Sequence, residues 1–429
     1  MHLTISSIPA EWFWGEKALL STNKHVMTIH LIDNDPLIAI QKAGRIISKQ
    51  GIREIALIGD AWNLNRCWAF WQGFYSPKKE SCITWPILLD KDRKELNDRI
   101  KVVDWVRHTI NTPADELGPE QLVQNTIGFI FSIAKNDANY RILAGKSLLD
   151  NRYLGLYSVG RSSDRNPVLL TIDYNPSGDT KTPTLFCLVG KGVTFDTGGY
   201  HLKNSVFMNS MKSDMSGAAM LTGALALAIC RGLKKRVQLI LCCTDNMING
   251  NALKAGDIIH YRNGKSVEVM NTDAEGRLIL ADGLIDASLI KPKFIVDCAT
   301  LTSAAKIALG NDYHALFSFD EILAKELIKS AREEHEYFWR LPLAEMHRCH
   351  LSSNFADISN VTYCNSTITA GASIAAAFLS FFIENYRCNW LHIDCSASYY
   401  EKEVEKWSAG STGLGVCTLA NFLLAKEKD

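Results

Sequence analysis

Residues 184–189 read Thr-Leu-Phe-Cys-Leu-Val, and residues 190–199 continue Gly-Lys-Gly-Val-Thr-Phe-Asp-Thr-Gly-Gly. The first run is short and almost wholly apolar, which is typical of a strand buried on both faces. Similar runs at 237–243, 294–298 and 390–393 predict further strands, and the segments 216–231 and 278–289 predict helices. Short buried strands alternating with helices indicate an α/β fold with a mostly parallel central sheet flanked by helices.

The polar motifs follow directly on these strands. The glycine-rich run with Lys191 and Asp196 follows the first strand, and Thr300-Leu301-Thr302 follows the strand at 294–298. Ligands of such sheets bind beyond the carboxyl ends of the strands, so these segments should converge on one crevice. The glycine pair Gly198-Gly199 would let the backbone turn tightly beside it.

The first hundred residues differ from the rest of the chain. They are rich in tryptophan, include a strand-like segment at 55–58 and hold none of the dense acidic motifs. A helix-like segment at 92–109 then leads into a Pro- and Asn-containing turn at 111–119. We therefore predict a smaller α/β accessory domain at 1–108 and a catalytic domain at 109–429.

The composition limits the kinds of partner that we expect the chain to bind. Lys plus Arg and Asp plus Glu both number 46 in 429 residues, so the formal net charge is +0 and no global field draws the chain to nucleic acid. Its longest basic run is Lys234-Lys235-Arg236. The N-terminus lacks the pattern of a signal peptide, and no uninterrupted apolar run reaches the roughly 18 residues that span a bilayer. We expect a cytoplasmic protein, without a membrane partner, that acts on a small molecule or peptide.

Four carboxylates stand out by their setting, namely Asp196, Asp214, Asp273 and Glu275. An extended segment would project Asp273 and Glu275 from the same face, where they could share an ion. Together the four carry a formal charge of −4, which two divalent cations would neutralise. Oxygen ligands favour Mn²⁺ or Mg²⁺, although Zn²⁺ also accepts carboxylates. The alternative, that these acids are caps or surface residues, stays open on spacing alone.

Longer motifs carry a resemblance to a known family. The octapeptide Asn-Thr-Asp-Ala-Glu-Gly-Arg-Leu at 271–278 resembles the signature of the leucine aminopeptidase family, and 189–199 with Lys203 and Met211-Lys212-Ser213-Asp214-Met215 extend the resemblance. It covers most of the chain after Thr109. The segments Gly15-Glu16-Lys17 and 67–73, with the shorter overall length, are most similar to one bacterial subgroup of the family.

The resemblance implies a role for each residue of the site. The implied metal ligands are Lys191, Asp196, Asp214, Asp273 and Glu275, with Asp196 and Glu275 bridging two ions; a ligating Lys191 must lose its proton. Lys203 and Arg277 are implied as catalytic residues outside the metal shell, Lys203 as donor to the oxyanion and Arg277 as holder of a bicarbonate base. Weaker implications place Met211, Thr300, Leu301 and Ser303 against the substrate, and Ser303, where the family commonly has glycine, would narrow the pocket.

The implied activity is a metal-dependent aminopeptidase that releases N-terminal residues from peptides in intracellular peptide turnover. In that family a water shared by two metal ions is the nucleophile. The bacterial subgroup implies a preference for N-terminal Glu or Asp, and the family implies a homohexamer. Two alternatives remain, another two-metal hydrolase such as a phosphoesterase, and a DNA-binding structural role.

Overall fold

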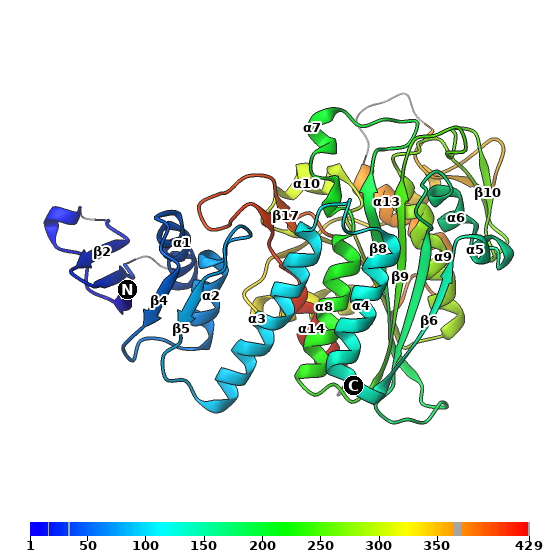
Figure 1. Ribbon diagram of the computed structural model, residues 1–429. Coiled ribbons are helices and arrows are strands. Elements are labelled where there is room, and N and C mark those ends of the chain that lie inside the picture. Colours follow the sequence, from blue (N-terminus) through cyan, green and yellow to red (C-terminus); the bar gives the residue numbers. More distant parts are fainter. Residues whose placement is uncertain (16, 33–34, 364–369, 428–429) are drawn as a thin grey trace. The chain divides into compact units, whose positions relative to one another are not determined.

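The computed structural model describes residues 1–15, 17–32, 35–363 and 370–427, so Glu16 of the quoted N-terminal segment lies outside the described residues. The chain divides into two compact units (Figure 1). The first comprises Met1–Asp104 with Tyr399–Thr412, and the second comprises Trp105–Ser398 with Gly413–Asp429. The boundary predicted after residue 108 falls within helix α3 (Asp90–Asn111). The first unit's role as an accessory domain stays a prediction.

The first unit is a small α/β body. Its five-stranded sheet has the order β2-β3-β1-β4-β5, formed by Leu20–Asn23, Val26–His30, His2–Ser6, Glu54–Leu57 and Cys82–Thr84. Helices α1 (Pro36–Lys49) and α2 (Leu64–Phe74) pack together where both carry glycine. A Cβ on Gly73 would lie 1.9 Å from the carbonyl oxygen of Gln41, so the two backbones can meet this closely only at glycine.

The second unit is built on an eight-stranded sheet of order β14-β13-β16-β12-β8-β9-β7-β6. The strands in that order are Phe338–Arg340, His314–Phe317, Trp390–Asp394, Phe294–Ala299, Thr184–Asp196, Arg236–Asn246, Val168–Tyr174 and Ala138–Ala144. The four central strands, from β16 to β9, pair in parallel, and antiparallel pairs flank them. This confirms the predicted α/β class with a mostly parallel sheet.

Helices α8 (Ser216–Cys230) and α9 (Glu275–Ile290) cover opposite faces of this sheet. A Cβ on Gly190 of β8 would meet Ala218 of α8, whereas the neighbouring Val189 touches the position of a Cβ on Gly283 of α9. Successive side chains of a strand point to opposite faces, so the two contacts lie on different sides. Both helices begin at the end of the sheet where β8 ends, which brings their first residues together (Figure 1).

The elements predicted from apolar patterning are all present, with longer strands than expected. β8 continues through the motif to Asp196 instead of ending at Val189. The segment Met211–Cys230 is long and apolar enough to cross a membrane by length and composition, but 89% of its apolar window is buried inside the protein. It is therefore a buried core segment of the second unit.

Candidate active site

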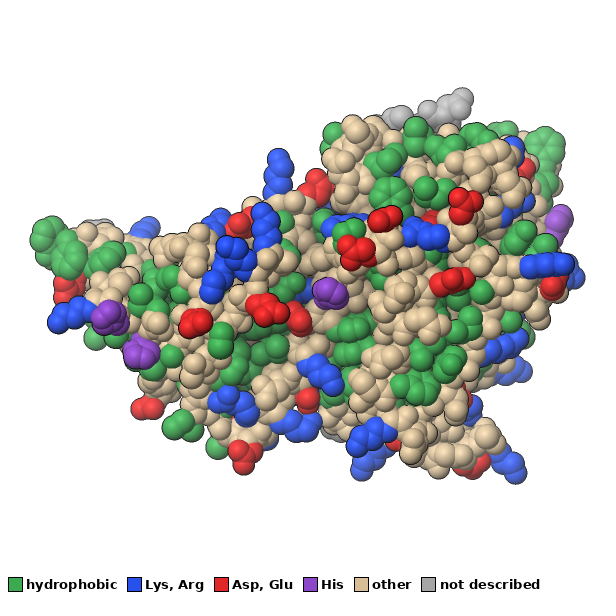
Figure 2. Space-filling view, in the orientation of Figure 1, with side chains coloured by type: hydrophobic (Ala, Val, Ile, Leu, Met, Phe, Trp, Pro, Cys, Tyr) green, Lys and Arg blue, Asp and Glu red, His purple; other side chains and the backbone are tan. Residues whose placement is uncertain are grey.

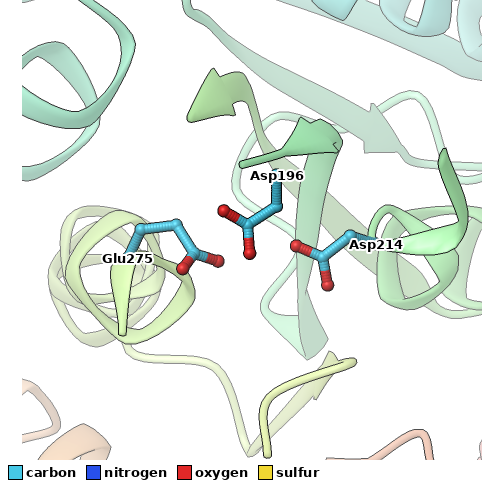
Figure 3. A group of neighbouring side chains, drawn as sticks. All are labelled: Asp196, Asp214 and Glu275. Atoms are coloured by element: carbon cyan, nitrogen blue, oxygen red, sulfur yellow. The ribbon is translucent and has the colours of Figure 1, made fainter. Parts of the chain in front are cut away.

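Three carboxylates meet at the carboxyl end of the central strands (Figure 3). Asp196 is the last residue of β8, Asp214 stands two residues before α8, and Glu275 is the first residue of α9. One oxygen of each lies within 4.8 Å of the others, and all three side chains are buried. We call this group the carboxylate cluster. Buried acids repel one another and lose hydration, so a cation is needed to hold them together.

Lys191 reaches the cluster from the middle of β8. Its Nζ lies 2.9 Å from Oδ2 of Asp214 and 2.8 Å from Oε1 of Glu275, and it donates to the carbonyl oxygen of Thr300 at 2.8 Å. A Cβ on Gly276 would stand 2.8 Å from this nitrogen, so glycine there leaves room for the lysine. The amine thus sits among groups from three elements of the fold.

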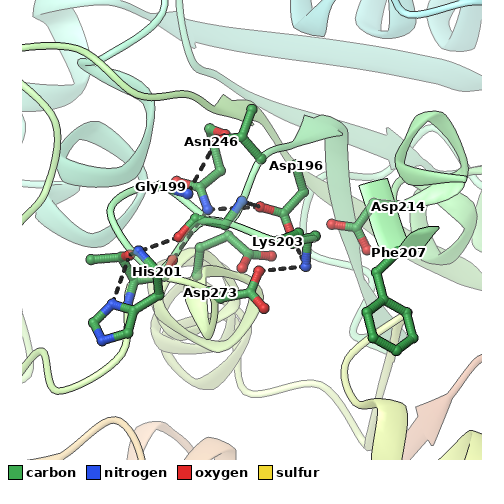
Figure 4. A network of polar contacts seen from close by, with 12 residues as sticks. Asp196, Gly199, His201, Lys203, Phe207, Asp214, Asn246 and Asp273 are labelled. Carbon is green, nitrogen blue, oxygen red and sulfur yellow. Dashed lines mark hydrogen bonds and ion pairs between the residues drawn. The ribbon is translucent and has the colours of Figure 1, made fainter. Parts of the chain in front are cut away.

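A second lysine, Lys203, lies between two of the acids (Figure 4). Its Nζ is 2.8 Å from Oδ2 of Asp196 and also pairs with Asp273. The backbone turns at Gly198 and Gly199, with φ of +88° and +62°, and so brings Lys203 to this position. The backbone N–H of Lys203 donates to the carbonyl of Thr197 at 3.0 Å. The predicted glycine turn is confirmed, and it delivers a cation to the cluster.

The expectation that Asp273 and Glu275 lie on one extended segment is wrong. Residues 272 and 273 form a turn, and α9 begins at Glu275. The physical reason is that a carboxylate in the first turn of a helix is stabilised by the helix dipole and the unpaired N–H groups there. Asp273 consequently pairs with Lys203, while Glu275 pairs with Lys191.

The electrostatics of the group follow from burial and crowding. Burial, with Glu275 and Asp214 nearby, raises the pKa of Asp196 well above its usual range. Burial also raises the pKa of Asp214 to about 6, although Lys191 opposes this rise. Burial lowers the pKa of Lys191, but the surrounding carboxylates outweigh it and the net shift is upward. Without a bound cation, Asp196 and Asp214 therefore bind protons more tightly than exposed carboxylates do.

Arg277, on α9, is buried two residues beyond Glu275. Its Nη1 donates to the carbonyl of Asn360 at 2.7 Å, and its Nε has no partner among the described residues. Burial lowers its pKa to about 10, against the opposing charges of Glu275 and Asp394, so it remains protonated at neutral pH. An unpaired buried guanidinium N–H suits an anion.

The segment after β12 closes another side of the cluster. Thr300 donates its hydroxyl to Oδ1 of Asp214 at 2.8 Å, and its carbonyl accepts from Lys191. Leu301 is half-buried, Ser303 begins α10 (Ser303–Leu309) on the surface, and Met211 begins the 3-10 turn Met211–Ser213 before α8. Thr300 touches the cluster, whereas no described contact joins Met211 or Ser303 to it.

Sequence reasoning missed two asparagines that fix the site. Asn246, the last residue of β9, donates to Oδ1 of Asp196 at 2.7 Å and to the carbonyl of Thr272 at 3.1 Å. Asn360 donates to the carbonyl of Asn271 at 2.7 Å and receives the N–H of Met270 at 2.8 Å. Asn246 follows closely on the strand predicted at 237–243, which was an available signal, but the loop around Asn360 carried none.

The face drawn in Figure 2 carries charges of both signs. Its Lys and Arg side chains are interspersed with Asp and Glu, in keeping with the balanced composition. In this α/β sheet, buried acids and two lysines gather at the carboxyl ends of the strands. This arrangement is typical of enzymes whose active sites bind cations.

Comparison with known proteins gives the family. Residues 104–420 match the cytosol aminopeptidase family catalytic domain, and residues 2–88 match a second domain described only as a peptidase. Peptidase B of Yersinia pestis is 59% identical over 428 residues, which is 100% of this chain and 99% of that protein. The chain therefore belongs to the cytosol aminopeptidase family and is a hydrolase of the aminopeptidase type.

Solved structures agree with this assignment. Cytosol aminopeptidase from Coxiella burnetii matches with a TM-score of 0.83 and 29% identity, covering 93% of this chain and 86% of that one. The bottromycin maturation enzyme BotP, solved in complex with Mn, matches with a TM-score of 0.84 and 27% identity over 99% of both chains. The leucine aminopeptidase resemblance seen in the motifs is confirmed, and the bacterial subgroup it favoured is Peptidase B.

Proposed function

We propose that this aminopeptidase uses two divalent metal ions, most naturally Mn²⁺, held by Lys191, Asp196, Asp214, Asp273 and Glu275. The observation that carries the proposal is the carboxylate cluster, three buried acids within 4.8 Å of one another. Five oxygen and nitrogen donors from β8, α9 and the segments just before α8 and α9 fit a dinuclear site of hard or borderline cations. The Mn complex of the relative BotP supports this choice of ion.

The two ions would supply Lewis acidity at the scissile carbonyl and lower the pKa of the attacking water. The chain's own part is to present ligands in the correct protonation state. Lys191 must release its proton before its amine can ligate, and so must the protonated carboxylates of the cluster. Metal uptake should therefore release protons and strengthen as the pH rises.

Lys203 is proposed as the donor to the oxyanion. The pKa of Lys203 is shifted upward, because Asp196 and its neighbours outweigh the lowering by burial, so its ammonium persists at neutral pH. Its short turn after Gly199 fixes the side chain at the edge of the cluster. A preorganised cation at the developing negative charge is usually a large term in amide hydrolysis.

Arg277 is proposed to hold a bicarbonate ion that acts as the general base. Its buried position and its unpaired Nε support an anion there, beside the acids that bind the metal ions. A weak base suffices because the attacking water is already acidified. Replacing Arg277 should therefore slow the reaction without removing the metal ions.

Substrate contacts are proposed along Thr300 and Leu301, with Met211 and Ser303 shaping the first side-chain pocket. The N–H of Leu301 already donates to Asp394 at 3.0 Å, so a substrate contact at Leu301 would use its carbonyl oxygen. A preference for N-terminal Glu or Asp rests on similarity to Peptidase B. The homohexamer, the cytoplasmic setting and a role in peptide turnover likewise rest on the family.

The phosphoesterase and DNA-binding alternatives receive no support from the family match. The decisive experiment uses chelator-stripped full chain, a panel of Glu, Asp and Leu p-nitroanilides, and added Mn²⁺, Mg²⁺ or Zn²⁺. Metal-restored release, fastest for Glu or Asp, is expected. Equal release before and after stripping, with no ion bound, would contradict the two-metal proposal. A clear preference for Leu would contradict the proposed preference for N-terminal Glu or Asp.

A further inference from the structure

Asp394 is a buried carboxylate beside the cluster that the ligand set does not use. It is the last residue of β16 and is 1% exposed. Its Oδ1 accepts the N–H of Leu301 at 3.0 Å, and its Oδ2 accepts the hydroxyl of Thr302 at 2.7 Å. One side chain thus holds two consecutive residues of the segment that follows β12.

That segment also touches the cluster on its other side. Thr300 accepts from Lys191 at 2.8 Å through its carbonyl and donates to Asp214 at 2.8 Å through its hydroxyl. The preceding residue, Ala299, is paired with Asp394 in the sheet and accepts the N–H of Cys395 at 2.7 Å. The loop from Thr300 to Thr302 is therefore clamped between β16 and the metal-ligand residues.

We propose that Asp394 is a positioning residue for catalysis, which fixes the segment Thr300–Thr302 so that its backbone can align the peptide substrate against the cluster. This role rests on the proposed substrate contacts of Thr300 and Leu301. Asp394 touches neither substrate nor ligand ion in it. It acts by holding the backbone that does.

The chemistry of the clamp requires a carboxylate. The hydroxyl oxygen of Thr302 already accepts the N–H of Ala305 at 3.1 Å as the N-cap of α10, so the hydroxyl proton needs an acceptor. Asp394 supplies that acceptor and a second one for Leu301. An asparagine of the same shape offers one acceptor oxygen and an NH₂ group, so it cannot satisfy both donors.

Glu336 provides a matched control within the same unit. It is also a buried carboxylate, and it also accepts one backbone N–H and one threonine hydroxyl, both from Thr418, at 2.9 and 2.6 Å. Thr418 lies on α14 (Val416–Lys426), which carries none of the proposed site residues. Both bonds end on Oε2, so the amide oxygen of a glutamine can keep them, unlike the two bonds that Asp394 divides between its two oxygens. Glu336→Gln therefore reports the cost to the fold of exchanging a buried carboxylate for an amide away from the site residues.

The test measures kcat, KM, bound metal and thermal stability of the full chain with Mn²⁺, using the p-nitroanilide that the wild type cleaves best. For Asp394→Asn we expect KM to rise about tenfold or more and kcat/KM to fall on the order of 10²-fold, with metal content unchanged, because small misplacements of a substrate are costly. Thr302→Val should reproduce part of the rise in KM. Thr302→Ser, which keeps the hydroxyl, should show the KM of the wild type. Glu336→Gln should leave KM at the wild-type value, whatever change in stability it causes.

Two results would overturn the role of Asp394. One is a wild-type KM in Asp394→Asn with activity reduced only in step with the folded fraction, as in Glu336→Gln. The other is loss of bound metal with full recovery of KM and kcat in excess Mn²⁺, which would make Asp394 a support of the cluster. A wild-type chain that cleaves no substrate would instead contradict the proposed function, and this role with it.

Discussion

Two buried acids of α9, one at its start and one near its middle, lie in contrasting surroundings. Glu275, its first residue, faces Asp196 and Asp214 across the cluster. Asp282, two turns later and 0% exposed, has one acidic neighbour, Asp286. It accepts the N–H of Leu156 at 2.9 Å, and Nε of Arg262 lies 4.0 Å from its Oδ1. Both acids are buried in one helix, yet only Glu275 of the two meets several other acids at one point.

Glu275 and Asp282 differ in how many other charged side chains lie around them. Around Lys191 and Lys203 stand four acids, namely Asp196, Asp214, Asp273 and Glu275, so four negative charges meet two positive ones and a formal charge of −2 is left. At Asp282 burial raises the pKa to about 7, despite the opposing hydrogen bond from Leu156 and the charge of Arg262. Burial raises the pKa of acids in both places, but only in the cluster do several acids and two lysines meet, an arrangement that favours a bound cation.

Replacing each of these two acids by its amide should give the largest contrast. Glu275→Gln should lower kcat/KM by more than about 10³-fold and weaken metal binding, because it removes a ligand from the cluster. Asp282→Asn should keep both properties and change only stability, since an amide oxygen can still accept from Leu156. Metal analysis with steady-state kinetics checks both variants. Equal losses in the two variants would show that burial, and not convergence, matters.

The next prediction separates the effect of the charge of Lys203 on catalysis from its effect on metal binding. Lys203→Ala should lower kcat by about 10²- to 10³-fold while metal content stays near that of the wild type, because it removes the proposed oxyanion donor. Lys426, a buried lysine 2.6 Å from Glu326 and away from the cluster, is the matched control. Lys426→Ala should leave kcat unchanged. Loss of both metal ions in Lys203→Ala would contradict its assigned role.

Two glycines of α9 sharpen the comparison further. A Cβ at Gly276 would lie 2.8 Å from Nζ of Lys191, whereas one at Gly283 would lie 2.7 Å from Cγ1 of Val189 in the core. Gly276→Ala should displace the lysine and reduce Mn²⁺ affinity by roughly 10- to 100-fold. Gly283→Ala should cost stability of about 1–3 kcal/mol through overpacking and spare the affinity. A Mn²⁺ titration followed by calorimetry distinguishes the two outcomes.

The last prediction is a pH dependence of stability that arises from Asp282. The pKa of Asp282 is higher in the folded chain than in the unfolded one, so the folded state binds its proton more tightly. The free energy of unfolding should therefore decrease as the pH rises from about 4 to 7, by up to about 1.4 kcal/mol per pH unit from this group. Asp282→Asn should flatten that part of the curve in urea unfolding. Parallel curves for the two proteins would rule this out.

Local sequence was sufficient for the elements and for the identity of the motifs. The apolar runs predicted β8, β9, β12 and β16, since buried parallel strands need continuous apolar side chains. The glycine pair after Asp196 predicted the turn, because its positive φ angles favour glycine. The signature from Asn271 to Leu278 pointed to the family, and the full-length relatives confirm it.

Tertiary structure alone decided which groups meet. The periodicity could not show that Asp273 and Glu275 are separated by a helix start, since helix boundaries depend on capping and dipole effects more than on pattern. Nor could it show that Asn246, Asn360 and Asp394 support the site, because each acts through contacts with residues far away in the chain. A single sequence specifies local conformation and chemistry, whereas contacts between distant residues arise only when the strands pair and the sheet gathers their ends.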